Sequence, residues 1–177
     1  FTADLMGFSK MEPNYELCQV NRLVADVIDF LKTQKNFQSV DLTFEGTATE
    51  ITSLADVNQC QQLLYNLINN AADATLDRAE TESRRIGVRT EHSLDNESFA
   101  LSVKDNGSGF DPEHLDRAFK ERFTTKKGGH GFGLLVCKRI IENHEGELHI
   151  DSSPGSGTTI RITFPVRAPA PQPTCIS

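Results

Sequence analysis

Four glycines in the segment GGHGFGL, residues 128–134, constrain the fold more than any other part of the sequence. The segment runs directly into LLVCKRII, whose apolar residues recur at helical spacing. Glycine costs roughly 0.5–1 kcal/mol relative to alanine inside a helix or strand. A run of this kind therefore indicates either a flexible surface loop or a backbone that comes close to a ligand.

The helix that follows this segment favours the second interpretation. A flexible linker is not expected to lead straight into an amphipathic helix, and the N–H groups at a helix N-terminus bind anions through unsatisfied donors and the helix dipole. We therefore expect phosphate binding here, with Lys126 and Lys127 immediately upstream as cations. The segment matches neither GxxxxGKS/T nor GxGxxG after a strand, which excludes a Walker site and a Rossmann fold.

Charge and composition exclude several other classes. A net charge of −7 argues against nucleic-acid binding, and no apolar run is long enough to span a membrane. The chain opens on Phe1 without a signal-peptide pattern, so we expect part of a longer, cytoplasmic protein whose membrane anchor, if it has one, lies upstream. The cysteines lack CxxC spacing and are expected to be three core residues and a tail thiol in a reducing compartment: Cys18, Cys60, Cys137 and Cys175.

Hydrophobic periodicity predicts helices and strands in alternating blocks. One helix begins with Asn21 as its N-cap, and a longer one, residues 57–79, follows a capping pair that Asp56 opens. A third helix, residues 132–144, ends where Gly146 suits a left-handed turn. Strands are predicted over 40–46 and 49–55, around a turn, and over 86–92, 98–105, 146–153 and 158–165. This order favours helices packed on one face of a mixed sheet.

Asparagines on the long helix form a second unusual pattern. Beside its apolar face, a polar stripe runs through Gln62, Asn66, Asn70, Asp73 and Asp77. The stripe is either a solvated face or a set of ligands. Asparagine is a mediocre helix former, so its repeated use in NLINN favours neutral oxygen ligands for a hard cation such as Mg²⁺.

The segment KDNGSGF, residues 104–110, has two interpretations as well. Asp, Asn, Gly and Ser are common in turns, but Asp105 ends a strand and could accept a hydrogen bond from an exocyclic amine. Gly107 and Gly109 would then let a ligand lie on the backbone. A calcium loop is disfavoured because further oxygen donors and a Glu at the twelfth position are missing.

Taken in order, these motifs resemble the ATP-binding catalytic domain of sensor histidine kinases, in the ATPase superfamily shared with Hsp90, gyrase B and MutL. The match covers about residues 20–165. NLINNAADA resembles the asparagine box, KDNGSGF the first glycine box and FKERFTTKK the phenylalanine box. GHGFGL resembles the second glycine box and PGSGTT the third. The resemblance implies an α+β fold, a two-layer α/β sandwich (the Bergerat ATP-binding fold). The opening LMGFSKMEP is similar to the end of a dimerisation helix and its linker.

The resemblance also implies a role for each motif. Asp105 would accept from the adenine amine with Thr158 assisting through water, while Gly107 and Gly109 shape the adenine wall. Asn70 would ligate Mg²⁺. The remaining site residues, near the phosphates or in the lid that closes over them, would be Asn66, Phe119, Phe123, Lys126, Gly129, Gly131, Gly133 and Leu134.

Two departures from the family pattern affect the expected chemistry. Asp73 and Ala74 stand where many kinases have a phosphate-binding Lys and an adenine-stacking aromatic residue. Asn66 stands where hydrolytic relatives have a Glu that activates water, and asparagine cannot act as a general base. We therefore expect transfer of the phosphoryl group to another acceptor rather than hydrolysis.

The function implied is that of a two-component sensor histidine kinase, which binds Mg-ATP and donates the γ-phosphoryl group to a histidine on a dimerisation domain. The residues divide into a helix end and linker (1–14), the ATP-binding domain (15–166) and a disordered Pro-rich tail (167–177). The implied partners are the dimerisation domain, in a homodimeric parent, and a response regulator receiver. None of the five histidines lies in the family's acceptor motif, so little autophosphorylation is expected. The alternatives are an anti-sigma-type serine kinase and a nucleotide-free interaction module.

Overall fold

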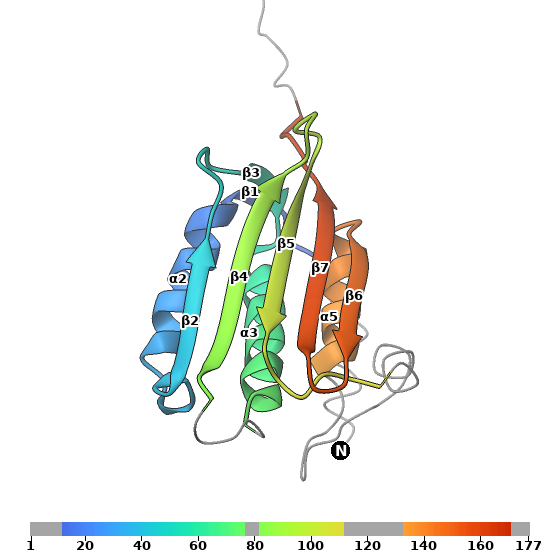
Figure 1. Ribbon diagram of the computed structural model, residues 1–177. Coiled ribbons are helices and arrows are strands. Elements are labelled where there is room, and N and C mark those ends of the chain that lie inside the picture. The colour runs from blue at the N-terminus through green and yellow to red at the C-terminus, as the bar shows by residue number, and fades with distance from the viewer. Residues whose placement is uncertain (1–11, 77–81, 112–132, 171–177) are drawn as a thin grey trace, which may run out of the picture.

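Five strands form the main sheet of the computed structural model, which describes residues 12–76, 82–111 and 133–170. Their spatial order is β2-β4-β5-β7-β6 (Figure 1). The strands are β2 (Val40–Glu45), β4 (Arg84–His92), β5 (Ser98–Asp105), β6 (Glu147–Ser153) and β7 (Gly157–Pro165). β2 pairs with β4 in parallel and the other pairs are antiparallel, so the predicted mixed sheet is confirmed.

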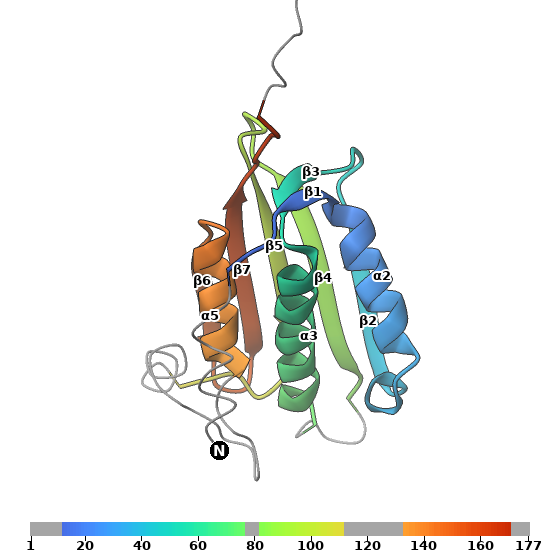
Figure 2. The same cartoon turned by 180° about the vertical axis from the view of Figure 1, so that it is seen from behind.

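Three α-helices of the described residues pack on one face of this sheet, as Figure 2 shows from the helix side. They are α2 (Val20–Lys32), α3 (Val57–Ala74) and α5 (Gly133–Asn143), and a 3₁₀ turn, η1 (Lys35–Phe37), follows α2. The other face of the sheet is uncovered in this view of the described residues, which confirms the predicted two-layer α+β arrangement. No helix in the described ranges is both long and apolar enough to cross a bilayer.

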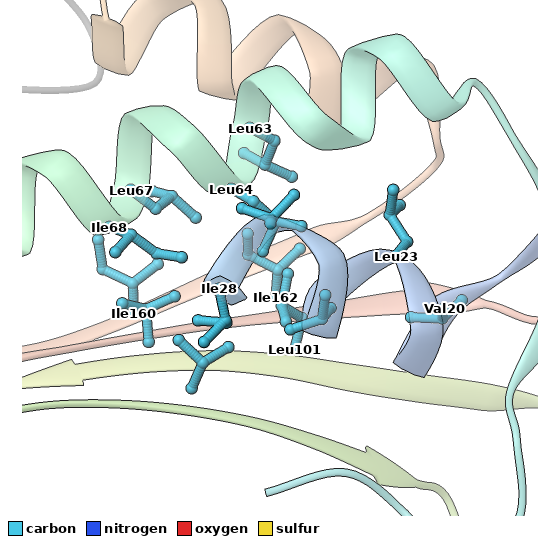
Figure 3. Close-up of a cluster of buried hydrophobic side chains, with 14 of the residues drawn as sticks. Val20, Leu23, Ile28, Leu63, Leu64, Leu67, Ile68, Leu101, Ile160 and Ile162 are labelled. Carbon is cyan, nitrogen blue, oxygen red and sulfur yellow. The ribbon is translucent and has the colours of Figure 1, made fainter. Parts of the chain in front are cut away.

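The central helix, α3, supplies much of the core. Leu63, Leu64, Leu67 and Ile68 are at most 2% exposed, because their spacing places them on a single face. Figure 3 shows them reaching from α3 into one cluster with Ile28 of α2 and with sheet residues that include Leu101, Ile160 and Ile162. Burying each such side chain stabilises the fold by about 1.5–3 kcal/mol, so packing determines where α3 lies across the sheet.

Asp56 caps the first turn of α3, as the sequence predicted. Its Oδ1 accepts from the Gln59 backbone N–H at 3.0 Å and its Oδ2 from the Asn14 backbone N–H at 2.8 Å. Its own backbone N–H donates to Nε2 of the buried His144 at 3.0 Å. A single capping residue therefore joins the segment before β1 to the start of α3 and the end of α5.

Two local predictions about the first half of the chain are wrong. Residues 49–55 do not form a hairpin with β2, since β3 (Thr52–Ala55) pairs instead with β1 (Glu16–Gln19) in a separate two-stranded sheet. Gln19 rather than Asn21 is the N-cap of α2, and the Asn21 side chain bonds to Thr47 and Thr90. These are long-range pairings, which local patterns do not encode.

The ends of the other two helices also differ from prediction. Helix α3 stops at Ala74 with Thr75 as C-cap, short of the predicted residue 79. After α5 the left-handed residue is Glu145, with φ 54°, and not Gly146. Gly146 is small for another reason: a Cβ there would lie 2.8 Å from the Phe164 ring.

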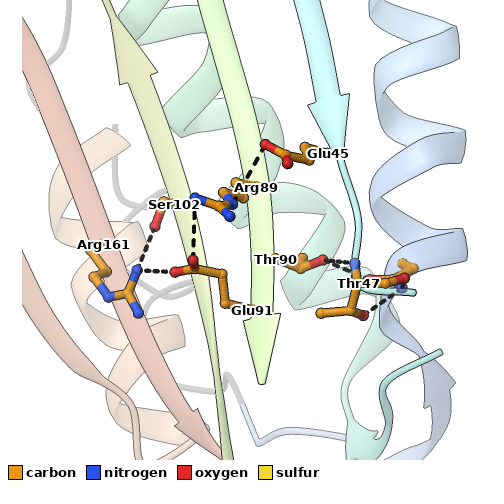
Figure 4. A network of polar contacts seen from close by, with 8 residues as sticks. Glu45, Thr47, Arg89, Thr90, Glu91, Ser102 and Arg161 are labelled. Carbon is orange, nitrogen blue, oxygen red and sulfur yellow. Dashed lines mark hydrogen bonds and ion pairs between the residues drawn. The ribbon is translucent and has the colours of Figure 1, made fainter. Parts of the chain in front are cut away.

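Charged side chains cover the helix-free face of the sheet (Figure 4). Arg161 contacts Glu91 at 2.5 Å, and Arg89 pairs with both Glu91 and Glu45. The Arg161 hydrogen bond holds the pKa of Glu91 below its ordinary value. Exposed pairs of this kind contribute little to stability. The charged side chains on this face are those of a surface in contact with water.

Replacement of Asp56 by alanine tests the capping arrangement. We expect Asp56→Ala to lower the free energy of unfolding by about 1–2 kcal/mol, because the backbone N–H groups of Gln59 and Asn14 lose their acceptor. Denaturant unfolding measures the loss. The matched control is Asp26→Ala, which removes an equal charge from the exposed face of α2 and should change stability by less than about 0.5 kcal/mol. Equal effects of the two substitutions would contradict the assigned role.

The described cysteines are protected thiols. Burial raises the pKa of Cys18 to about 11 and those of Cys60 and Cys137 to about 12, from an ordinary value of 9.0. Cys18 and Cys137 are buried and Cys60 is half-buried. Because the thiolate is the nucleophile, the raised pKa values of these thiols lower their reactivity.

We expect iodoacetamide at pH 8 to leave Cys18, Cys60 and Cys137 unmodified in the folded chain and to label all three in denaturant, as read by peptide mass spectrometry. The thiol pKa values are higher in the folded than in the unfolded state. The stability that comes from keeping these thiols protonated is therefore complete below pH 9 and is lost as pH rises through 11 to 12. Rapid labelling of the folded chain at any of these cysteines would contradict the burial.

Candidate functional site

Four segments that are far apart in the sequence meet at one end of the molecule, the lower end in Figures 1 and 2. They are the C-terminal end of α3, the loop after β5, the turn between β6 and β7, and the first turn of α5. The helices α3 and α5 run antiparallel, since Gln59 bonds to Asn143 and Asn66 lies by Gly133. Residues predicted from three separate motifs are therefore brought together.

Asp105 lies at the centre of this end, as the last residue of the central strand β5. Its side chain is buried, and Oδ1 accepts from the backbone N–H groups of Gly107 at 2.8 Å and Thr158 at 3.3 Å. Strand register places Thr158 directly opposite, and its hydroxyl bonds to Ser152 at 2.8 Å. The carboxylate is thus held by backbone groups at a fixed position on the floor of the site.

The glycines after Asp105 fit tightly against neighbouring backbone. A Cβ at Gly107 would lie 2.4 Å from the carbonyl oxygen of Ala74, the last residue of α3. Gly109 has φ 69°, and a Cβ there would lie 2.1 Å from the carbonyl oxygen of Ser153. We predicted that these glycines allow a ligand to approach the backbone. The close contacts that the structure describes are instead between two backbone segments. They attach the loop to α3 on one side and to the β6–β7 hairpin on the other.

Asn66 connects α3 to the start of α5. Its Nδ2 lies 3.5 Å from the carbonyl oxygen of Gly133, and its amide also bonds to Cys137, which lowers that thiol's pKa against the larger effect of burial. Asn70 lies one turn further along α3, half-buried, toward the same end. A Cβ at Gly133 would meet no described atom within 4 Å, so the described chain leaves space at this helix N-terminus.

Arg84 is a residue of the site region that sequence reasoning missed. Its Nε donates to Thr75 Oγ1 at 3.0 Å, its Nη2 to the Ala72 carbonyl at 2.8 Å, and its Nη1 to Ser39 Oγ at 2.8 Å. The guanidinium therefore caps the negative end of the α3 dipole. No local motif identifies it, because Arg84 reaches the helix from the neighbouring strand.

The loop after β5 has further supports that no motif predicted. Ser108 donates its backbone N–H to the Ala74 carbonyl at 2.9 Å. The side chain of Asn106 bonds to the backbone of Ser83 and Arg85, and Ser152 Oγ accepts from the Phe110 backbone N–H at 2.8 Å. Each bond joins the loop to a different neighbour, so the loop geometry is determined from several sides.

Five predicted site residues lie outside the described residues: Phe119, Phe123, Lys126, Gly129 and Gly131. The described part of the site contains Asn66, Asn70, Asp105, Gly107, Gly109, Gly133, Leu134 and Thr158.

The described residues fit a nucleoside triphosphate with a hard cation. Asp105 offers a fixed acceptor for an exocyclic amine, and the first turn of α5 offers N–H donors and a positive dipole end for anions. Among the described residues no cluster of three His, Cys, Asp or Glu side chains could hold a metal ion. Asparagine oxygens with few other protein ligands suit Mg²⁺, which keeps much of its coordination shell for water and phosphate.

Comparison with known proteins agrees with this geometry. The family model described as "Histidine kinase-, DNA gyrase B-, and HSP90-like ATPase" matches residues 55–168. Sporulation kinase A of Bacillus subtilis (strain 168) is 33% identical over 165 residues, which cover 92% of this chain and 26% of that protein. The nucleotide-free catalytic domain of histidine kinase ThkA has a TM-score of 0.72 and 26% identity, covering 88% of this chain and 99% of that one. Full-length ShkA in complex with AMPPNP has a TM-score of 0.77 at 21% identity, covering 95% and 35%.

The chain therefore belongs to the family of histidine kinase-, DNA gyrase B- and HSP90-like ATPases. The family model and the likeness to sporulation kinase A and to the catalytic domain of histidine kinase ThkA confirm the predicted resemblance to histidine kinase catalytic domains. The chain spans about a quarter of the length of sporulation kinase A.

Substitution of Arg84 tests whether it holds the end of α3. We expect Arg84→Gln to lower the free energy of unfolding by about 1–2 kcal/mol, since the Ala72 carbonyl and the helix dipole lose a charged donor. The neighbouring Arg85→Gln is the matched control, because Arg85 is exposed and its change should stay within about 0.5 kcal/mol. Urea unfolding of both variants gives the comparison, and a loss for Arg85→Gln as large as for Arg84→Gln would refute the specific role.

Proposed function

We propose that this chain is the ATP-binding catalytic domain of a two-component sensor histidine kinase. The observation that carries the proposal is the meeting of three predicted motifs at one site, with Asp105 buried at the strand end and Asn66 of α3 against Gly133 of α5. ShkA, whose fold this chain shares, is described in complex with AMPPNP, an ATP analogue.

Asp105 would recognise adenine. A buried acceptor at a fixed position discriminates for a ligand that supplies a donor, because an unmatched ligand displaces water from the carboxylate without replacing that hydrogen bond. The buried Thr158 is the neighbouring hydroxyl that would contact adenine through water. Gly107 and Gly109 would form the adjoining wall by holding the loop against α3 and the β6–β7 hairpin.

The phosphates would lie between α3 and the N-terminus of α5. The N–H groups of Gly133 and Leu134 would bind phosphate oxygens, and Asn70 would ligate Mg²⁺ with Asn66 nearby. Mg²⁺ would supply charge neutralisation of the triphosphate when bound. From outside the described residues, Lys126 and the amides of Gly129 and Gly131 would add phosphate contacts, and Phe119 and Phe123 would fix the lid.

Phosphoryl transfer to a histidine agrees with the residues at the site. Asn66 cannot deprotonate water, and its amide is directed to the Gly133 carbonyl and the Cys137 thiol. This chain would position the donor, and a histidine on a dimerisation domain would be the acceptor. A response regulator receiver would then take the phosphoryl group, in a cytoplasmic part of a homodimeric kinase.

The proposed division of the chain follows from this function. Residues 15–166 would form the catalytic domain, residues 1–14 the end of a dimerisation helix with its linker, and residues 167–177 a tail. Residue 167 is an exception within the tail, because Arg167 bonds through its backbone to Ser53 and Leu54 and belongs structurally to the domain.

Calorimetry with Mg-ATP tests the function. We expect saturable binding, weakened at least about tenfold by Asp105→Asn, since that change removes the charge from the adenine acceptor. Asn70→Ala should reduce the difference in affinity between ATP with Mg²⁺ and ATP with EDTA. The matched control is Asp151→Asn on the exposed edge strand β6, which should bind like the parent chain.

Two outcomes would contradict the proposal. Absence of binding heat for the folded parent chain would support a nucleotide-free interaction module. Strong incorporation of labelled phosphate into the chain alone would place the acceptor within these residues, contrary to a histidine supplied by another domain.

A further inference from the structure

The loop after β5 contains the dipeptide Asn106-Gly107, which is chemically labile in an unfolded chain. The backbone nitrogen of Gly107 can attack Cγ of Asn106, because glycine has no Cβ to hinder the approach. The new bond closes a five-membered succinimide, the bond from Cγ to Nδ2 breaks, and ammonia leaves. Water then opens the ring to aspartate or isoaspartate. No other asparagine of the chain precedes a glycine.

The folded chain holds the Asn106 amide away from this reaction. Its Oδ1 accepts from the Arg85 backbone N–H at 2.8 Å, and its Nδ2 donates to the Ser83 carbonyl at 2.8 Å. The Asn106 backbone N–H also donates to the Arg85 carbonyl at 3.2 Å. Both ends of the amide are therefore bound to the chain at the start of β4, and cyclisation requires that both side-chain bonds break.

The attacking nitrogen is held on the other side of the loop. The Gly107 N–H donates to Asp105 Oδ1 at 2.8 Å. A Cβ at Gly107 would lie 2.4 Å from the Ala74 carbonyl oxygen, which also accepts from the Ser108 N–H at 2.9 Å. The nitrogen and the carbon that would join are thus held by different neighbours, the nitrogen by Asp105 beside α3 and the carbon by β4.

We propose that Asn106 is a deamidation site at which the reaction is suppressed by the fold and proceeds when the loop after β5 opens. The suppression comes from hydrogen bonds more than from burial, since Asn106 is only half-buried. Water, the only other reactant, therefore reaches the loop once these bonds break. The rate of deamidation then follows the opening of this part of the chain.

Neither product can rebuild the loop. Aspartate in place of Asn106 has no N–H to donate, so a carboxylate oxygen would face the Ser83 carbonyl. The new charge also lies next to the buried Asp105, and neighbouring carboxylates repel each other. Isoaspartate lengthens the backbone by one carbon atom just before Gly107, where the fit against Ala74 leaves no space. Deamidation therefore makes an opening of the loop irreversible.

Peptide mass spectrometry at pH 8 tests the suppression. We expect Asn106 to deamidate at least about a hundredfold faster in the chain unfolded by guanidinium chloride than in the folded chain, because the reaction requires opening. A peptide of residues 103–110, which has no fold to protect it, should react as fast as the unfolded chain with or without the denaturant. Similar rates in the folded and unfolded chain would overturn the proposal. A faster reaction in the folded chain, with Asp105 removing the Gly107 proton, would overturn it as well.

A substitution that reproduces one product tests its effect on the fold. We expect Asn106→Asp to raise the unfolding equilibrium constant by about tenfold or more, as read by urea unfolding, because a donor is lost and a charge is added beside Asp105. Asn96→Asp is the matched control, since it makes the same change of charge at an exposed turn residue and should unfold like the parent chain. Equal stability of Asn106→Asp and the parent chain would contradict the assigned role.

The consequence for nucleotide binding rests on the proposed function. A chain kept unfolded until Asn106 has reacted, and then refolded, should bind Mg-ATP at least about tenfold more weakly than one refolded at once. Asn106→Gln is the control for ageing at other positions, because its longer side chain cannot close a five-membered ring and its binding should not change with time. Undiminished binding by the fully deamidated chain would overturn this consequence. Failure of the fresh parent chain to bind ATP would instead contradict the proposed function, since the mass and stability measurements need no nucleotide.

Discussion

The packing of α3 on the sheet is the interaction on which the rest of the structure depends. Leu64, Leu67 and Ile68 are buried in one cluster with residues of the sheet and of α2, and this burial determines the helix position. Asp56 then fixes its first turn and Arg84 its last. Because the asparagines lie beside the buried face, the same packing that stabilises the domain orients the polar residues toward α5 and the end of β5.

The proposed nucleotide site is built mainly by backbone contacts. Asp105 is held by two N–H groups, and Gly107 and Gly109 allow three segments to approach more closely than side chains would permit. Carbonyl groups at the end of α3 are satisfied by Ser108 and Arg84. These contacts hold Asp105 at a fixed position, as our proposal that it discriminates for adenine requires.

Several parts of the fold were predictable because their information is local. The Asp56 cap, the extent of β5, the turn between β6 and β7, and the helix after the second glycine box each depend on residues a few positions apart. The parallel pairing of β2 with β4 and the pairing of β1 with β3 were not predictable in this way. Residues 40–46 and 49–55 both resemble strands, and nothing in their own sequence selects their partners.

The sequence by itself identified the residues that we propose recognise a nucleotide: the asparagines on a helix, the aspartate after a strand and the glycines before a helix. Their motifs are short because each depends on local backbone geometry. The tertiary structure alone decided that Arg84 caps α3, that Gly107 packs on Ala74, and that the Asn106 side chain bonds to Ser83 and Arg85. These contacts join segments far apart in the chain, and they arise only when burial of the apolar faces fixes how helices and strands are placed.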